Sequence, residues 1–370
     1  MSIAHSAVLL QAIERRISLR WPATVPYLPV DLRDESGHMS ASMKVLVTGG
    51  SGFLGSHVAE QLVAAGHDVR ALVRKTSNRK FLSTLKGIEL AEGSVEDRKS
   101  VDAAMKDVEA VVHSAGLVKA RNEAEFFACN TQGTVNMLDA AIEHAPKLVR
   151  FVHISSLEAC GPSLDRKPVP LDQEHPVTAY GRSKLAAEKE VAGRKDKLPV
   201  VILRPALIYG PREAEVFEAF KAVQRHQYPV IGDGKMIACY TYGPDCARAC
   251  VQAITANVPS GSIYFVDDGA EPLSMTRAMG ELIPEALGVR PFFRMGIPFP
   301  VLSLASFGVE AYGKVRGKAV MLTREKVAML RHHWVCESQK TQHDLGWKPE
   351  VRFTDGVKLT ATWYQDNGWL

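Results

Sequence analysis

Tyr180 and Lys184 are the two residues whose types and spacing most directly suggest chemistry. They stand four positions apart in the segment Tyr-Gly-Arg-Ser-Lys. Residues four apart on a helix lie on the same face, so both side chains can enter one cleft. A lysine cation at about 4–6 Å typically lowers the pKa of a phenol by about 1–3 units from its ordinary value of about 10. A tyrosine tuned in this way can donate a proton to a carbonyl or accept one from an alcohol.

A glycine-rich turn precedes this pair in the chain. The apolar run Lys44–Val47 predicts a buried parallel strand, and residues 53–65 have helical periodicity. Between them, Gly49, Gly52 and Gly55 follow one another at intervals of three. Glycine permits a tight turn and lets the backbone approach a pyrophosphate at the positive N-terminus of a helix. The spacing differs from the G-x-G-x-x-G form, but its place between a strand and an apolar helix predicts a dinucleotide site.

The second predicted strand suggests which dinucleotide binds. Asp68–Val73 is followed by Arg74 and Lys75, and no acidic side chain occurs at positions 69–85. A site that prefers NAD usually presents an acid here to the ribose 2′-hydroxyl, whereas an arginine accommodates the 2′-phosphate of NADP. The sequence therefore favours NADP over NAD, with Arg74 at the phosphate. A solvated basic loop is the alternative interpretation.

Further segments occur in an order that is typical of one enzyme family. Ser155-Ser156 follows a predicted strand. The other segments are His113–Gly116, Asn130–Thr134, Leu203–Pro205, Tyr209–Pro211 and Leu345–Pro349. Together with the glycine turn and the tyrosine–lysine pair, they resemble the extended short-chain dehydrogenase/reductase family, which is the NAD-dependent epimerase/dehydratase superfamily. The resemblance runs from about Met43 to the C-terminus and is strongest to the 3β-hydroxysteroid dehydrogenase and dihydroflavonol reductase subgroups.

The resemblance implies a role for each matching residue. Tyr180 would be the general acid/base, and Lys184 would lower its pKa and hold the nicotinamide ribose. Ser156 would hydrogen-bond the reacting oxygen, where a hydroxyl can stabilise developing charge, and Ser155 is the neighbouring candidate. The predicted cofactor-binding residues are Gly49, Ser51, Gly52, Phe53, Leu54, Gly55, Arg74, Ser94, Val95, Ser114, Ala115, Gly116, Asn130, Tyr180, Lys184 and Pro205.

Two segments depart from the family pattern. The family often has an aspartate after the glycine of the third strand to contact adenine, and this chain has Ser94 there. The segment Gly243-Pro244-Asp245 replaces the usual β-branched residue and acid before a helix. Asp245 is expected to cap that helix rather than to belong to the site.

Composition fits an ordinary globular enzyme. The chain has 370 residues, 46% of them hydrophobic and 23% charged, and a net charge of +4 with scattered basic residues. This mild charge argues against nucleic acid as a partner. The six cysteines show no disulfide framework and no C-x-x-C spacing, which predicts buried free thiols in a cytoplasmic protein and no metal site.

Strand and helix patterns alternate from Met43 onward. They predict an α/β fold, a Rossmann doubly wound parallel sheet with the cofactor across the carboxyl ends of its strands. We expect the NAD(P)-binding domain over residues 43–210, with a late strand near 262–266. Residues 211–370 should form a smaller, mainly helical substrate-binding lobe, which includes a helix near 245–256. Residues 1–42 are expected to be an extension that is disordered or absent from the mature protein.

The stretch Pro291–Val309 is rich in apolar residues. Pro298, Pro300 and Arg294 argue against a spanning helix, which needs about 20 mainly apolar residues. Three interpretations compete. A core helix is favoured over a lid above an apolar pocket and over a peripheral membrane contact.

Two enzyme functions would use the same residues. One is hydride transfer between nicotinamide and a secondary alcohol or ketone of a lipophilic, steroid-like or other apolar substrate. The other is a nucleotide-sugar 4-epimerase or dehydratase, whose relatives usually carry an asparagine in the strand after the active helix. Residues 203–208 contain no asparagine, which favours the lipophilic oxidoreductase. A third hypothesis is a non-catalytic NADP-binding regulatory module, and a homodimer through residues 123–144 and 178–192 would be common in this family.

Overall fold

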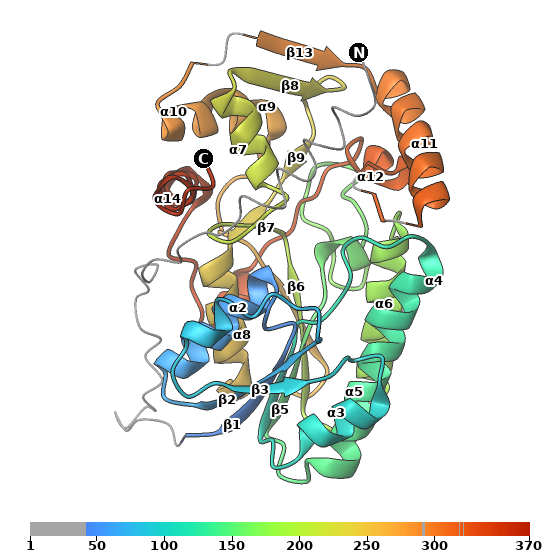
Figure 1. Cartoon of the computed structure of the whole chain (residues 1–370), viewed down its shortest axis with the longest axis vertical. Coiled ribbons are helices and arrows are strands. Elements are labelled where there is room, and N and C mark those ends of the chain that lie inside the picture. The colour runs from blue at the N-terminus through green and yellow to red at the C-terminus, as the bar shows by residue number, and fades with distance from the viewer. Residues whose placement is uncertain (1–41, 291–292, 318, 321) are drawn as a thin grey trace.

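The computed structural model describes residues 42–290, 293–317, 319–320 and 322–370. The predicted extension, residues 1–42, lies outside the described residues except for Ser42. Figure 1 shows a sheet flanked by helices in its lower half and a smaller lobe above it.

A seven-stranded parallel sheet forms the larger part and follows the order β11-β6-β5-β4-β1-β2-β3. The chain order reverses between β1 and β4, which pair in parallel through Thr48 and His113. This arrangement opens a crevice at the carboxyl ends of the strands, where doubly wound folds bind dinucleotides. The predicted α/β Rossmann fold is confirmed. The strands are β1 (Lys44–Thr48), β2 (Asp68–Val73), β3 (Glu89–Glu92), β4 (Ala110–His113), β5 (Arg150–Ile154), β6 (Val200–Pro205) and β11 (Ser262–Val266).

Helices cover both faces of the sheet. Alternate residues of a strand point to opposite faces. Val45 and Val47 of β1 therefore pack under α2 (Phe53–Ala64) and α8 (Gly243–Thr255), whereas Leu46 belongs to the cluster of the other face. That face is covered by α3 (Arg98–Met105), α5 (Gly133–His144) and α6 (Ala179–Ala192).

Helix α8 was expected in the smaller lobe but packs on the sheet. Its inner face consists largely of small residues, among them Ala247, Ala249 and Ala253, which let it approach α2 closely. The expected cap at Asp245 is also wrong, because Tyr242 precedes the first helical residue. Asp245 instead accepts hydrogen bonds from the backbone N–H groups of residues 350 and 351, at 2.9 and 2.8 Å. It therefore ties α8 to the C-terminal segment.

Residues 123–144 form an interrupted helix. It comprises α4 (Glu123–Phe126), a π-helical turn (Phe127–Gln132) and α5. Such π turns are rare and often mark functional sites. This one carries Asn130, which the sequence places near the cofactor.

The smaller lobe is built around its own apolar cluster. Tyr209, Phe220 and Tyr364 are among its fully buried side chains. Helix α7 begins at Phe217, and a second π-helical turn, Ala278–Leu282, separates α9 from α10. Its elements are β7 (Leu207–Tyr209), α7 (Phe217–Gln224), β8 (Gln227–Ile231), β9 (Ile237–Ala238), β10 (Tyr240–Tyr242), β12 (Leu273–Ser274), α9 (Met275–Arg277), α10 (Ile283–Leu287), β13 (Phe293–Ile297), α11 (Phe299–Arg316), α12 (Arg324–Met329), α13 (Gln339–Asp344) and α14 (Phe353–Asp366).

The apolar stretch near residue 300 does not form a core helix, although that interpretation was favoured. It forms β13 and the first part of α11, and Leu304 and Phe307 of α11 are 75% and 60% exposed. Among the described residues, no helix is long and apolar enough to cross a bilayer. The prediction for the cysteines is confirmed, because all six are free and buried.

Candidate active site

A cavity of about 740 Å³ lies along the carboxyl ends of the strands and extends under the smaller lobe. It contains 16 of the 17 residues that the sequence places in the site, and the exception is Asn130. The cavity runs across the sheet, because residues that follow β2 and residues that follow β5 both line it and these two strands lie three places apart. The turn after β2 therefore marks one end, and the turn after β5 lies toward the smaller lobe.

The glycine turn after β1 is shaped by close backbone approaches. Gly49 has a φ of 71°, and a Cβ there would lie 2.8 Å from the Ala115 nitrogen. A Cβ on Gly55 would overlap the Gly49 carbonyl oxygen. Gly52 precedes α2, is exposed and provides no side-chain cap, so the first turn of α2 presents backbone N–H groups to the cavity. These residues fit the pyrophosphate of a dinucleotide.

Arg74 and Ser94 line the far end of the cavity. Arg74 is exposed and has no ion pair among the described residues, whereas its neighbour Arg79 is paired with Glu92 at 2.7 Å. Ser94 Oγ accepts a hydrogen bond from the Glu96 backbone N–H at 3.3 Å. Arg74 is thus the cation at this end that remains available to a ligand.

Asn130 lies behind the cavity wall and holds part of it in place. Its Oδ1 accepts from the Leu117 N–H at 2.7 Å, and its Nδ2 donates to the Leu117 carbonyl at 3.1 Å and to Ser183 Oγ at 2.9 Å. It is almost fully buried. Asn130 therefore fixes the turn at Gly116 and ties it to α6, rather than lining the cavity.

Tyr180 and Ser156 meet at the centre of the cavity. Thr178 caps α6 by accepting from the Gly181 N–H at 2.9 Å, which sets the start of the helix that carries Tyr180. Ser156 follows β5, and its side chain hydrogen-bonds Tyr180 and thereby lowers the pKa of the phenol. The Oγ of Ser155 is buried and has no hydrogen-bond partner among the described residues. Ser156 is therefore the serine that contacts the tyrosine.

The net shift of the Tyr180 pKa is opposite to the one expected. Burial raises this pKa, the carboxylates of Glu158 and Glu215 raise it further, and the Ser156 hydrogen bond offsets only part of the effect. Lys184 is not among the groups that shift the Tyr180 pKa, and its ammonium donates to the Ile154 carbonyl oxygen at 2.5 Å. Burial also lowers the pKa of Lys184 to about 8.

The wall toward the smaller lobe contains charged residues that the sequence did not predict. They are four carboxylates and one lysine: Glu158, Glu213, Glu215, Glu325 and Lys326. Thr178 Oγ1 donates to Glu158 at 2.7 Å, and Glu215 is paired with Lys119 at 3.2 Å and with Lys326 at 3.3 Å. Burial raises the pKa of Glu158 and of Glu213. Their positions two residues after Ser156 and after Pro211 are the only sequence signals that connect these two carboxylates with the site.

The rest of this wall is apolar. It is formed by residues from the turn after β5, from β7, from the segments around β9 and α9, and from α12. These residues are Leu157, Leu207, Ile208, Val216, Met236, Ala238, Tyr240, Met275, Met329, Leu330 and Trp334.

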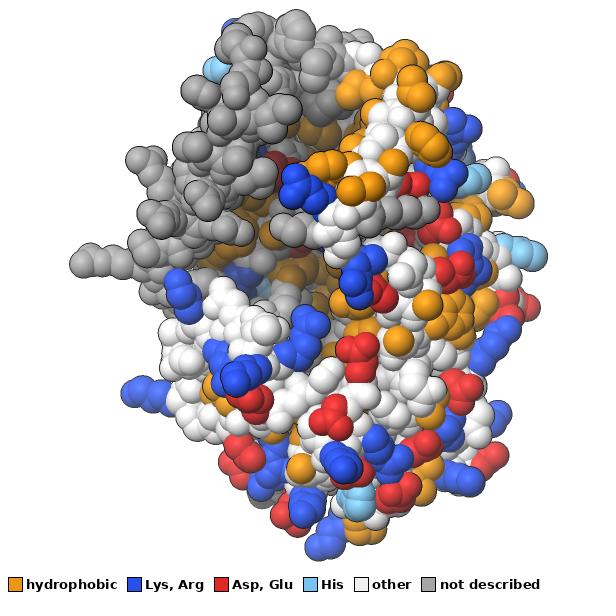
Figure 2. Space-filling model, turned by 45° about the vertical axis from the view of Figure 1, so that its right-hand side comes forward, with side chains coloured by type: hydrophobic (Ala, Val, Ile, Leu, Met, Phe, Trp, Pro, Cys, Tyr) orange, Lys and Arg blue, Asp and Glu red, His pale blue; other side chains and the backbone are white. Residues whose placement is uncertain are grey.

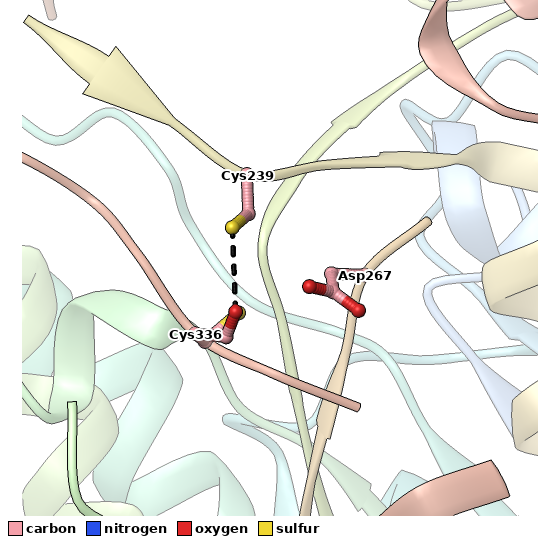
Figure 3. A group of neighbouring side chains, drawn as sticks. All are labelled: Cys239, Asp267 and Cys336. Carbon is pink, nitrogen blue, oxygen red and sulfur yellow. Dashed lines mark hydrogen bonds between the residues drawn. The ribbon is translucent and has the colours of Figure 1, made fainter. Parts of the chain in front are cut away.

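Among the described residues, two groups of side chains each bring three potential metal ligands together, although the sequence predicts no metal site. Cys239 and Cys336 lie beside Asp267 in the core of the smaller lobe (Figure 3). Cys239 Sγ donates to the Cys336 carbonyl at 3.4 Å, and Asp267 accepts from the Gly269 N–H at 3.2 Å. A hydrogen bond with Cys239 and burial raise the pKa of the Cys336 thiol. Because metals bind thiolates, hydrogen bonding within the protein explains this cluster without an ion.

The second group lies at the surface of the larger domain. Its members are Asp102, Glu143 and His144, and Arg98 pairs with Asp102 at 2.6 Å and with Glu143 at 2.5 Å. The arginine already pairs with both carboxylates of this group.

Comparison with known proteins agrees with the fold. The model of the NAD dependent epimerase/dehydratase family matches residues 45–266, more than half of the chain. A ceramide reductase of Caulobacter vibrioides is 27% identical over 88% of this chain and 96% of its own length. A putative UDP-glucose 4-epimerase of Methanocaldococcus jannaschii is also 27% identical, over 87% of this chain and 99% of its own.

A solved structure gives the same result for the fold. The UDP-glucose 4-epimerase of Thermotoga maritima superposes with a TM-score of 0.72 at 23% identity, over 88% of this chain and 99% of its own. The sheet order, the glycine turn and the family match agree. The chain therefore belongs to the NAD dependent epimerase/dehydratase family and is a nicotinamide-dependent enzyme of the extended short-chain dehydrogenase/reductase type.

Proposed function

We propose that this enzyme transfers a hydride between a nicotinamide cofactor, preferably NADP, and a secondary alcohol or ketone of a lipophilic substrate. The observation that carries this proposal is the charge of the cavity wall toward the smaller lobe. Four carboxylates line it, and its single lysine, Lys326, is already paired with Glu215 at 3.3 Å.

Such a wall disfavours a nucleotide sugar. A nucleotide diphosphate carries at least two negative charges, and proteins usually bind it with arginine, lysine or helix N-termini. Besides Lys326, the basic side chains among the described lining residues are Arg74 and Lys184. Arg74 lies at the far end, and Lys184 lies beside the tyrosine. A second diphosphate would therefore meet carboxylates rather than cations.

The apolar part of the wall supports a lipophilic substrate. Leucine, isoleucine, methionine and tryptophan side chains approach from both the turn after β6 and α12. Pockets for apolar ligands combine such walls with a few polar groups that orient the reacting end. Here the polar groups are Ser156 and Tyr180, so a carbonyl would sit at the centre with its apolar remainder under the smaller lobe. The similarity to a ceramide reductase agrees with this class of substrate.

Each residue of the centre has a distinct part in the reaction. The nicotinamide, when bound, supplies the hydride to the carbonyl carbon or accepts it from the alcohol. Tyr180 donates a proton to the oxygen during reduction and accepts it during oxidation. Its raised pKa keeps the phenol protonated near neutral pH, which suits proton donation in the reductive direction. Ser156 donates a hydrogen bond to the same oxygen as its charge develops.

Lys184 positions the tyrosine helix and is placed to contact the ribose. Its ammonium lies near the glycine loop after β4, since a Cβ on Gly116 would be 3.9 Å from Nζ. A hydroxyl of the nicotinamide ribose at this loop would be within reach of a lysine donor. Arg74 at the far end supports NADP, because a guanidinium pairs with a 2′-phosphate.

The test is cofactor turnover by the purified full chain. NADPH and NADH are each offered with steroid-like ketones, long-chain ketones and UDP-sugars. Net oxidation of NADPH with an apolar ketone is the expected result. Conversion of a UDP-sugar without net change in the nicotinamide would replace this proposal with an epimerase or dehydratase function.

A further inference from the structure

We propose that helix α11 docks the protein on the surface of an anionic lipid bilayer, with the helix lying in the plane of the interface. The docking surface is the apolar face of α11, formed by Val301, Leu304, Phe307, Tyr312 and Val315. This inference goes beyond the proposed reaction and does not depend on it.

The apolar face is unusually exposed. Val301 is 58%, Leu304 75%, Phe307 60%, Tyr312 61% and Val315 86% exposed. The opposite side of the helix is packed, since Leu302 and Ser306 are buried. Most of the large apolar side chains of α11 therefore point outward, whereas Leu302 and Ser306 face the protein. This orientation is the reverse of the usual one for a helix at a protein surface.

The concentration of these residues distinguishes α11 from the rest of the surface. Of the 11 large hydrophobic side chains that are exposed in the described part of the chain, five lie on this one helix of 18 residues. Figure 2 shows hydrophobic side chains gathered at the upper right of the visible face, where α11 lies. Single exposed hydrophobics are normal, whereas a contiguous group marks a contact with a partner or a membrane.

Two arginines border the apolar face. The Arg316 guanidinium lies 5.5 Å from the centre of the Tyr312 ring, and that of Arg324 lies 5.8 Å from the centre of the Phe307 ring. Glu310 is paired with Arg324 at 2.8 Å. Apolar side chains bordered by arginines are the pattern by which an interfacial helix binds anionic lipid.

The alternative occupant is a second copy of the chain. In a symmetric dimer the same patch would face itself, which would bring the basic residues of both copies together. Charge complementarity therefore favours anionic lipid over self-association.

Helix α11 lies next to the wall of the cavity that holds Tyr180. Helix α12, which packs against α11, contributes Lys326, Met329 and Leu330 to the cavity wall. Near the C-terminal end of α11, Gly313 and Gly317 border a second hollow together with Arg121, in the segment that follows Val118 of the cavity wall. A bilayer bound to α11 would thus lie beside the cavity.

The experiment is co-flotation of the purified full chain with vesicles, without cofactor or substrate. Vesicles of phosphatidylcholine are compared with vesicles that also contain phosphatidylglycerol. The wild-type protein should bind the anionic vesicles more tightly, and high salt should weaken this binding. The double variant Leu304→Asp/Phe307→Asp should lose at least about tenfold in affinity, because each change removes an apolar side chain from the contact.

Leu164→Asp serves as the matched control. Leu164 is 87% exposed but lies outside α11, so its change should leave vesicle binding intact. Equal binding by the wild type and the double variant would overturn the proposal. So would a wild-type dimer that binds no vesicles and becomes monomeric in the double variant, which sedimentation equilibrium would detect. Because no turnover is measured, either outcome is independent of the proposed reaction.

Discussion

The Lys184 ammonium donates a hydrogen bond to the Ile154 carbonyl oxygen at 2.5 Å. Ile154 is the last residue of β5, and Lys184 lies on the helix that begins beside Tyr180. The bond connects β5, which is followed by Ser156, with α6, which carries Tyr180. Lys184 therefore sets the geometry of the centre in addition to any contact with a ribose.

The position of Lys184 predicts how stability depends on pH. Burial lowers its pKa to about 8 from the ordinary 10.5, so between these values the unfolded chain binds a proton that the folded chain has lost. Stability rises with pH wherever the unfolded state binds more protons. The Lys184 contribution should therefore raise the free energy of unfolding by about 3 kcal/mol as the pH rises from 8 to 10.5. Below pH 8 this contribution should not change with pH.

Urea unfolding of the wild type and of Lys184→Met across the same pH range checks this prediction. The difference in free energy of unfolding between the two proteins should change with pH in favour of the wild type. Lys189→Met is the matched control on the same helix, because Lys189 is exposed. A difference that is constant from pH 8 to 10.5 would contradict the lowered pKa.

Tyr180→Phe should reduce turnover by at least about 10²–10⁴-fold, because it removes the hydroxyl that exchanges the proton. Cofactor affinity should change little, since the ring and the surrounding backbone remain. Steady-state kinetics and cofactor titration measure the two effects separately. Tyr312→Phe, on the exposed face of α11, is the control and should behave like the wild type. Full activity of Tyr180→Phe would remove this residue from the mechanism.

Glu158→Gln should lower the pKa of Tyr180, because the Glu158 carboxylate is the largest cause after burial that raises it. Alcohol oxidation needs the phenol to accept a proton, so its rate should rise with pH up to the Tyr180 pKa. In the variant this rise should move to lower pH. The pH profile of kcat for oxidation is the measurement, with Glu123→Gln as control, since Glu123 pairs with Arg182 at the surface. An unchanged profile would show that Glu158 does not act on the tyrosine.

The sequence predicts the local parts of the site better than the long-range ones. The glycine turn and the pair Tyr180 and Lys184 on α6 are short segments. The residues next to them in the sequence predict the strand, turn or helix that holds them. The carboxylates of the wall come from distant segments, as the 2.7 Å bond between Glu325 and the Ala179 N–H shows across 146 positions. No local pattern encodes that proximity.

Two errors in the fold have the same origin. The small residues of α8 suit a tight contact with α2, but nothing in residues 243–255 indicates which layer they join. The apolar residues of α11 suggest burial, and only the placement of the helix shows that the larger ones point outward. Hydrophobicity predicts that a side chain will be covered, and tertiary structure decides what covers it.

Arg74→Ala should weaken NADPH binding by about ten- to a hundredfold and leave NADH binding nearly unchanged. The guanidinium is exposed at the cavity end and has no ion pair among the described residues, so a 2′-phosphate would gain a charge-assisted hydrogen bond of about 1.5–3 kcal/mol from it. NADH lacks that phosphate, so its affinity should not depend on this guanidinium. Titration calorimetry with both cofactors measures the ratio.

Lys75→Ala is the matched control for Arg74. Lys75 is the next residue and is exposed, but it does not line the cavity, so its loss should weaken both cofactors only slightly through long-range charge. Similar losses for NADPH and NADH in Arg74→Ala would mean that the arginine supports the loop rather than the phosphate. The preference for NADP would then have no residue to account for it, and NAD would become the expected cofactor.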